Sequence, residues 1–326
     1  MTELNPRETQ VAIKYLKDFF EKKLAEKLNL IRVSAPLFVT PESGLNDNLT
    51  GVEKAVSFEM RKYNEKIEIV QSLAKWKRFA LKWYGFNIDE GLYADMNAIR
   101  PDEVLDNIHS IYVDQWDWEK VIRKNDRTTD YLVNIVKDIY DVFKETETYI
   151  NSLYSNNFTK KLPEDIKFIT SQELENLYPN ETPEKREYLI AEKYGAVFVS
   201  KIGQPLDSGK PHGTRSPDYD DWNLNGDIIF WNPTTNAVLE LSSMGIRVDE
   251  ESLRKQLRIA KAEERKTLEY HRRLLNGELP FTVGGGIGQS RICMFFLEKK
   301  HIGEVQASVW TEDILEECRE NNIFLL

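Results

Sequence analysis

The chain has 326 residues, of which 41% are hydrophobic, so it can bury a large core. It carries 44 Lys and Arg against 54 Asp and Glu, and the formal net charge of -10 disfavours a protein that holds a long nucleic acid by neutralising its phosphates. No apolar run approaches the length of about 18 residues that a membrane span needs, and the N-terminal segment MTELNPRETQ lacks the apolar stretch of a signal peptide. We therefore expect a cytoplasmic protein with no membrane and no nucleic-acid partner.

Cysteine and histidine usage excludes two further classes. Cys293 and Cys318 form no Cys-x-x-Cys pair, and the four histidines are spread along the chain without metal-ligand spacing. This pattern fits a reducing compartment and disfavours a structural disulfide or a zinc site. The chain has no internal repeat and no linker rich in Pro, Gly or Ser, so we expect one catalytic domain over residues 1–326.

Three long helices can be predicted from apolar spacing and from start and stop signals. The first ends near Asn29, and the second covers residues 128–154. The third begins at the Thr182-Pro183 signal and ends before Gly195. Between the first two, LIRVSAPLFV alternates but contains Pro36, which is typical of an edge strand or a strand end.

Short β-rich runs dominate after the third helix. GAVFVSKIG, NGDIIFWNP and AVLELSSMGIRV are joined by turns of hairpin length, and residues 249–276 resemble a helix with a solvated charged face. The prediction is an α+β fold with an antiparallel sheet flanked by helices. Strict alternation in ELSSMG places Glu240, Ser242 and Met244 on one face and leaves a gap of small residues on the other.

The segment TVGGGIGQSRICMFFL combines four glycines with one arginine, Arg291. A dinucleotide-binding fingerprint would need glycine where Gln289 stands, and a P-loop would need a Gly-Lys-Ser/Thr end. One interpretation is a tight turn from strand to helix. The other is bare backbone that, beside Arg291, suits a phosphate or a flat base.

Two other arginines lie in segments that also combine apolar and charged residues. Arg100 in MNAIRPDE precedes HSIYVDQWDWE, which we expect to return as the second strand of a hairpin, and Arg247 ends the strand ELSSMGIRVD. Together, LNLIRVSAPL, RPDE with HSIYVDQWDWE, and GGGIGQSR resemble the three signature motifs of class II aminoacyl-tRNA synthetase catalytic domains. Along nearly its whole length the chain resembles the ammonia-dependent asparagine synthetase, or aspartate ammonia ligase, family, also through SLAKWKR, PDYDDW and LNGDI.

This resemblance implies ATP-dependent synthesis of L-asparagine from L-aspartate and ammonia through a β-aspartyl adenylate, with release of AMP and pyrophosphate, by a homodimer. It implies that Arg100 contacts the α-phosphate, that Arg291 holds distal phosphates or stacks on adenine, and that Asp227 and Glu240 hold Mg²⁺. Related synthetases carry an aromatic side chain against adenine where this chain has Val113. The full implied ATP-binding set is Arg100, Glu103, Ser110, Val113, Asp227, Glu240, Ser242, Gly288 and Arg291.

For the amino acid, the resemblance implies that Lys77 and Arg247 grip one carboxylate. The substrate-binding residues that it implies are Ser72, Lys77, Gln115, Asp117, Asp220, Ser243 and Arg247, with Gln115, Asp117 and Asp220 receiving the ammonium group. Asp47, in SGLNDNLTG, would accept a proton from ammonium and join Arg100 and Arg291 as catalytic residues. The alternative for each residue is a surface ion pair, and for Asp220 and Lys77 the sequence does not decide between the two.

Two other functions stay open. An aspartyl- or asparaginyl-tRNA synthetase paralogue would share the same pocket, but the length and the acidic balance leave no room for an anticodon-binding module. A catalytically silent paralogue would have lost charged residues such as Arg100, Glu103 and Arg291, which are all present. Because Thr2 follows Met1, we do not expect the N-terminal cysteine nucleophile of glutamine-dependent synthetases.

Overall fold

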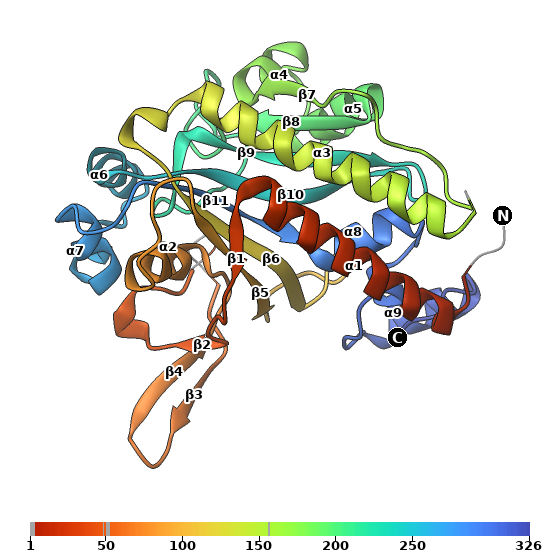
Figure 1. The fold of residues 1–326 in the computed structure, drawn as a ribbon, viewed down its shortest axis with the longest axis horizontal. Helices are drawn as coiled ribbons and strands as arrows, with labels where there is room; N and C mark the ends of the chain where they lie inside the picture. The colour runs from red at the N-terminus through yellow and green to blue at the C-terminus, as the bar shows by residue number, and fades with distance from the viewer. Residues whose placement is uncertain (1–3, 48, 50–52, 156) are drawn as a thin grey trace.

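The computed structural model describes residues 4–47, 49, 53–155 and 157–326, and an eight-stranded sheet runs through it (Figure 1). The strand order is β1-β5-β6-β11-β10-β9-β8-β7. The strands are β1 (Leu30–Arg32), β5 (Gly91–Ile99), β6 (Tyr112–Val121), β7 (Lys167–Thr170), β8 (Ala196–Ser200), β9 (Asp220–Asn232), β10 (Ala237–Arg247) and β11 (Thr282–Gly288).

The predicted antiparallel sheet is confirmed for the central strands from β5 to β8, which pair antiparallel throughout. The outermost pairs, β1 with β5 and β7 with β8, are parallel. Parallel neighbours need a crossover between them, and in both cases helical segments supply it. The expected hairpin of Arg100 is confirmed as the pair β5 and β6.

The three predicted long helices are confirmed, and the third begins and ends at the predicted signals, Thr182 and Gly195. Helix α1 begins after Asn5, whose side chain caps the Glu8 N–H, and ends at Asn29 in the left-handed conformation at φ 58°. The helices are α1 (Pro6–Leu28), α2 (Ala74–Trp83), α3 (Thr129–Leu153), α4 (Ser171–Leu177), α5 (Pro183–Tyr194), α6 (Glu250–Ile259), α7 (Glu269–Leu275), α8 (Gln289–Phe296) and α9 (Glu312–Glu320), with 3-10 turns at Pro41–Ser43, Lys124–Asp126, Glu263–Thr267 and Ile302–Glu304.

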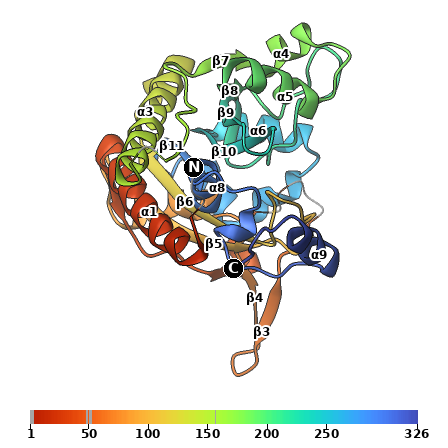
Figure 2. The ribbon, with the colours of Figure 1, turned by 90° about the vertical axis from the view of Figure 1, so that its right-hand side faces the viewer.

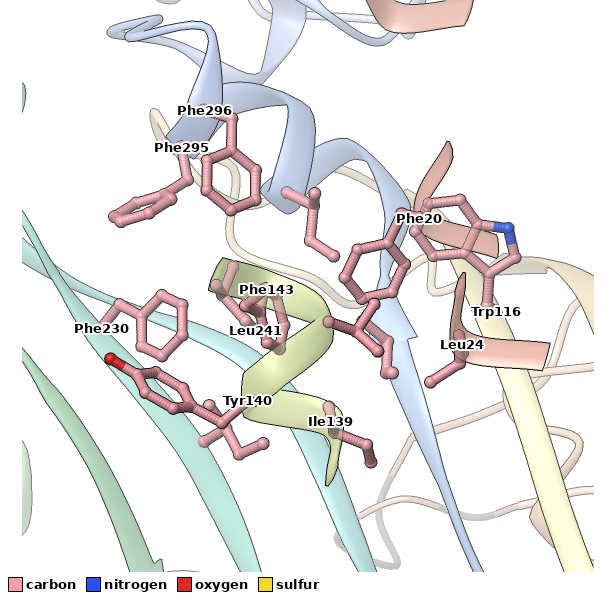
Figure 3. Close-up of a cluster of buried hydrophobic side chains, with 14 of the residues drawn as sticks. Phe20, Leu24, Trp116, Ile139, Tyr140, Phe143, Phe230, Leu241, Phe295 and Phe296 are labelled. Carbon is pink, nitrogen blue, oxygen red and sulfur yellow. The ribbon is translucent and has the colours of Figure 1, made fainter. Parts of the chain in front are cut away.

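One face of the sheet carries the largest apolar core, which α1, α3 and α8 cover (Figures 1 and 2). Figure 3 shows Phe20 of α1, Phe143 of α3 and Phe295 of α8 meeting Phe230 of β9 and Trp116 of β6. Trp116 and Trp118 both point into this core. Because neighbouring strand residues point to opposite faces, the polar residues that alternate with them lie on the other face, where the cavity described below is found.

The other face carries α2, α6 and α7, which pack around a second apolar cluster. The predicted single solvated helix over residues 249–276 is wrong, because α6 ends at Ile259 and a 3-10 turn separates it from α7. Tyr270 and His271 are fully buried. The sequence did not predict that these side chains are buried, because Glu, Lys and Arg surround them in the chain.

The predicted alternation in β10 is also wrong. The pairing with β9 shifts by one residue between Glu240 and Ser242, and so Leu241 and Met244 both point into the core under α8. Ser243 consequently shares the opposite face with Arg247. A bulge of this kind reverses the facing of every residue beyond it, which periodicity cannot foresee.

The segment predicted as one strand around Pro36 forms two short strands, β1 and β2 (Phe38–Val39), with Pro36 between them. Proline has no N–H for a ladder, so pairing stops there. Strand β2 joins β4 (Glu65–Ile69) and β3 (Ser57–Met60) in a three-stranded sheet whose hairpin projects from the molecule (Figure 1). Within the described residues, no helix is both long and apolar enough to cross a bilayer.

Candidate active site

A cavity of about 340 Å³ lies over the sheet, on the face opposite α1 and α3. Arg100, Glu240 and Arg291 come from three distant segments and all line it. The other predicted site residues that line it are Asp47, Ser72, Lys77, Glu103, Ser110, Val113, Gln115, Asp117, Asp220, Ser242, Ser243, Arg247 and Gly288. Asp227 is the exception, and its side chain reaches the lining only through its bond to Arg215.

Lys77 lines the cavity from the first turns of α2 and is 1% exposed. Its Nζ donates to Asp117 Oδ1 at 2.5 Å and to the Gly285 carbonyl at 2.9 Å. Burial lowers the pKa of Lys77, and the Asp117 carboxylate offsets that shift only in part. Because Asp220 is also 1% exposed, neither residue belongs to a surface ion pair.

Arg247, at the end of β10, is held between two buried carboxylates. Its Nε and Nη2 donate to Glu119 at 3.0 and 2.7 Å, and its Nη1 donates to Asp220. Thr282 Oγ1 adds a bond of 2.7 Å to Glu119. Burial alone would raise the pKa of Glu119, but the Arg247 guanidinium and the Lys77 ammonium hold it below its ordinary value.

Glu119 was not among the predicted site residues. A signal was present, because Gln115, Asp117 and Glu119 alternate with two tryptophans, and this pattern puts the three polar side chains on one face of a strand whose other face is apolar.

The glycine run forms a strand, not a turn, and its bare backbone makes room for these side chains. A Cβ on Gly284 would stand 1.9 Å from Glu119 Oε2, and one on Gly286 would stand 2.2 Å from Gln115 Oε1. Both neighbours lie on β6, which pairs with β11. The glycines at these two positions therefore leave room for protein side chains that lie across the strand, and Gly286 also lines the cavity.

Arg215 was also missed by the sequence analysis. It lies in the connection between β8 and β9, and its Nη2 donates to Asp227 Oδ1 at 2.6 Å while its Nη1 donates to Ser243 Oγ. Burial raises the pKa of Asp227 to about 6, although the Arg215 guanidinium opposes the shift, and the Glu240 carboxylate adds to it.

Asp227 and Glu240 offer hard oxygen ligands of the kind that Mg²⁺ prefers. Among the residues that the structure describes, no three His, Cys, Asp or Glu side chains gather where they could hold a metal. Two carboxylates fit Mg²⁺ that is shared with the phosphates of a nucleotide, since this ion is commonly bound by one or two carboxylates plus phosphates.

Arg100 and Arg291 bring positive charge to the lining of the cavity. Arg100 follows β5, donates weakly through Nη2 to the Gln71 carbonyl at 3.4 Å, and has a buried Nε without a partner in the described parts of the chain. Arg291 lies in the first turn of α8, and its Nη1 donates to the Glu240 carbonyl at 2.9 Å. Both guanidinium groups therefore retain N–H donors for an anion.

Asp47 is 2% exposed, and its Oδ1 accepts the Leu49 N–H at 3.0 Å. Its Oδ2 has no partner among the described residues, and burial raises its pKa although Lys75 and Arg100 oppose the shift. A carboxylate with a vacant oxygen beside the cavity can accept a proton. Residues 48, 50 and 51 of the predicted loop, together with Met1 and Thr2, lie outside the described residues.

Comparison with known proteins decides the family. A sequence profile of the family described as aspartate-ammonia ligase matches residues 7–322. The chain belongs to this family. Relatives named aspartate--ammonia ligase include one from Fusobacterium nucleatum, 61% identical over 326 residues, which are 100% of this chain and 99% of that protein, and one from Clostridium perfringens, 63% identical over 324 residues, 99% and 96% of the two chains.

Solved structures of two aminoacyl-tRNA synthetases have a fold similar to that of this member of the aspartate-ammonia ligase family. Asparaginyl-tRNA synthetase from Entamoeba histolytica, in complex with asparaginyl-adenylate, matches 92% of this chain and 66% of its own with a TM-score of 0.68 and 12% identity. Aspartyl-tRNA synthetase from the same organism matches 92% and 58% with a TM-score of 0.60 and 14% identity. The predicted resemblance to class II synthetase catalytic domains is confirmed at the level of the fold, and the predicted ligase family is confirmed by the sequence relatives.

Asp218 is a further buried carboxylate, and it was not among the predicted site residues. Asp218 is fully buried and accepts bonds from His271 Nε2 at 2.9 Å, Arg265 Nη1 at 3.1 Å and Lys75 Nζ at 3.4 Å. Burial would raise the pKa of Asp218, yet Lys75 and these neighbours hold it well below its ordinary value. Asp218 thereby ties helix α2, the loop before β9 and the α7 region together.

Proposed function

We propose that the chain makes L-asparagine from L-aspartate and ammonia at the expense of ATP, through a β-aspartyl adenylate and with release of AMP and pyrophosphate. The observation that carries this proposal is the meeting of Lys77, Arg100, Arg247 and Arg291 around one cavity, in a member of the aspartate-ammonia ligase family. We further propose that residues 1–326 act as one catalytic domain, that two copies form a homodimer, and that the enzyme works in the cytoplasm.

Aspartate would bind at the inner end of the cavity. Lys77 and Arg247 would hold its α-carboxylate, and Gln115, Asp117 and Asp220 would receive its ammonium group. The buried pairs Lys77 with Asp117 and Arg247 with Glu119 support this assignment, because they fix the donors in place before the substrate arrives. Ser72 and Ser243 line the same part of the cavity and would add hydroxyl contacts.

ATP would lie across the outer end of the cavity, with Glu103, Ser110, Val113, Ser242 and Gly288 around it. The β-carboxylate of aspartate attacks the α-phosphorus, a bond to carboxylate oxygen forms, and the bond to the pyrophosphate oxygen breaks. Arg100 would hold the α-phosphate and Arg291 the distal phosphates, so that two anions can approach each other. Asp227 and Glu240 would hold Mg²⁺, which supplies further neutralisation of phosphate charge.

The second step joins ammonia to the activated carbonyl. Ammonium predominates at neutral pH, so it must lose a proton before its nitrogen can attack. Asp47 would take that proton through Oδ2, which has no other partner in the described structure. A carbon–nitrogen bond then forms, the nitrogen releases a second proton to solvent, the bond from carbon to the phosphate oxygen breaks, and AMP leaves.

The direct test is incubation of the chain with aspartate, Mg²⁺, ATP and ¹⁵N-ammonium, with and without tRNA, and detection of AMP and ¹⁵N-asparagine by mass spectrometry. Labelled asparagine without tRNA is the expected result. AMP that forms only when tRNA is added would instead favour an aspartyl- or asparaginyl-tRNA synthetase, and no AMP in either case would favour a catalytically silent relative. Sedimentation equilibrium of the same preparation tests the homodimer.

A further inference from the structure

Arg215 is a buried cation that the steps above do not use. Its side chain is 8% exposed and lines the cavity. It bonds to Asp227 and Ser243, and its Nε, 3.9 Å from Asp220 Oδ2, has no hydrogen-bond partner within the described residues. A guanidinium that is buried beside a ligand cavity with an N–H to spare can accept an anion there.

The carboxylate that Arg215 holds is one of the two that would hold Mg²⁺. Asp227 and Glu240 lie on neighbouring strands, and Arg215 is a cation that bonds directly to Asp227. Two cations on one carboxylate repel each other, and strongly so where water is largely excluded. A metal ion and Arg215 can therefore both lie beside Asp227 only if anionic oxygens come between the two cations.

The backbone on both sides of Arg215 is anchored. His212 Nε2 lies 2.9 Å from Glu187 Oε1, and Ser216 Oγ donates to Asp218 at 2.8 Å while its carbonyl accepts a bond from Trp222. These contacts hold the neighbours of Arg215 in place, and so the Arg215 side chain is kept beside the cavity that it lines.

We propose that Arg215 neutralises Asp227, and that it turns from Asp227 to phosphate oxygens when metal-bound ATP enters. This inference rests on the proposed function, because it assumes that the cavity takes ATP. Arg215 then opposes the binding of a metal ion alone and supports the binding of metal with nucleotide. Loss of its charge must shift the two affinities in opposite directions.

The test compares Arg215→Met with the wild type and with a control, Arg123→Met, which alters an arginine side chain that is 55% exposed and paired with Asp89. Binding of Mn²⁺ alone is followed by electron paramagnetic resonance, and binding of ATP with Mg²⁺ by calorimetry, both without aspartate so that no turnover occurs. We expect Arg215→Met to bind Mn²⁺ at least about threefold more tightly and ATP about tenfold more weakly, the value of one charge-assisted hydrogen bond. The control should change neither.

Shifts of both affinities in the same direction, or no shift, would overturn the proposal, because a purely structural role weakens both and a purely repulsive one strengthens both. Arg215→Lys keeps the charge that the buried Asp227 needs for folding but cannot bond to Asp227 and Ser243 at once, so we expect smaller shifts of the same opposite signs. This variant carries the test if Arg215→Met does not fold. A wild type that fails to bind ATP with Mg²⁺ would overturn the proposed function as well.

Discussion

Glu119 is the residue whose replacement tests the buried charge arrangement most directly. Glu119→Gln keeps the shape of the side chain but removes the charge that faces Arg247 at 2.7 Å and lies 3.9 Å from Lys77. Removal of one partner from a buried ion pair costs about 3–5 kcal/mol, because the remaining charge is left without compensation. Since Arg247 keeps Asp220 and Lys77 keeps Asp117, we expect the lower end, about 3 kcal/mol.

The assay is urea unfolding followed by circular dichroism, together with the KM for aspartate. Arg247 would lose the carboxylate that fixes two of its nitrogens, so we expect KM to rise by about tenfold, the equivalent of about 1.4 kcal/mol. The matched control is Glu164→Gln, whose side chain is 89% exposed and pairs with Lys144 at 3.1 Å, and which should change stability by less than about 0.5 kcal/mol. An unfolding free energy for Glu119→Gln within about 1 kcal/mol of the wild type would refute the reasoning.

Three further predictions follow from the same geometry. Gly284→Ala places a methyl group 1.9 Å from Glu119 Oε2 and should destabilise the chain by about 1–3 kcal/mol in urea, whereas Gly213→Ala, with its nearest neighbour at 3.6 Å, should be neutral; equal effects would argue against the close approach. Because the folded-state pKa of Glu119 lies below the ordinary 4.5, its contribution is complete above pH 4.5 and is lost as the pH falls through the folded value, so acid unfolding curves of Glu119→Gln should slope less than those of the wild type. Arg291→Ala should abolish pyrophosphate release and leave the melting temperature within about 2 °C, since its guanidinium bonds only to the Glu240 carbonyl among the described contacts; an active variant would remove Arg291 from the mechanism.

Local sequence signals were sufficient to predict the long helices and the antiparallel pairing of the central strands. The Asn29 end of α1, the Thr182-Pro183 start of α5 and the Gly195 stop are short-range effects of capping and backbone freedom, so they act through neighbours in the chain. The family resemblance rested on several motifs that occur in the same order along the chain. Each candidate catalytic residue was identified by its position in one of these motifs. Their roles stay predictions, although the structure places nearly all of them around one cavity.

The sequence by itself determined where the long helices begin and end, and the family. It predicted Lys77, Arg100, Arg247 and Arg291, which all line the cavity, but it missed Arg215 and Glu119. Only the tertiary structure decided that Met244 faces the core, that the glycines of β11 leave room for Glu119, and that Arg215 holds Asp227. These features depend on strand register and on contacts between segments more than ten residues apart. No periodicity within one segment encodes them, because a one-residue bulge reverses the facing of a strand and a buried ion pair is chosen by whatever charge the fold brings opposite it.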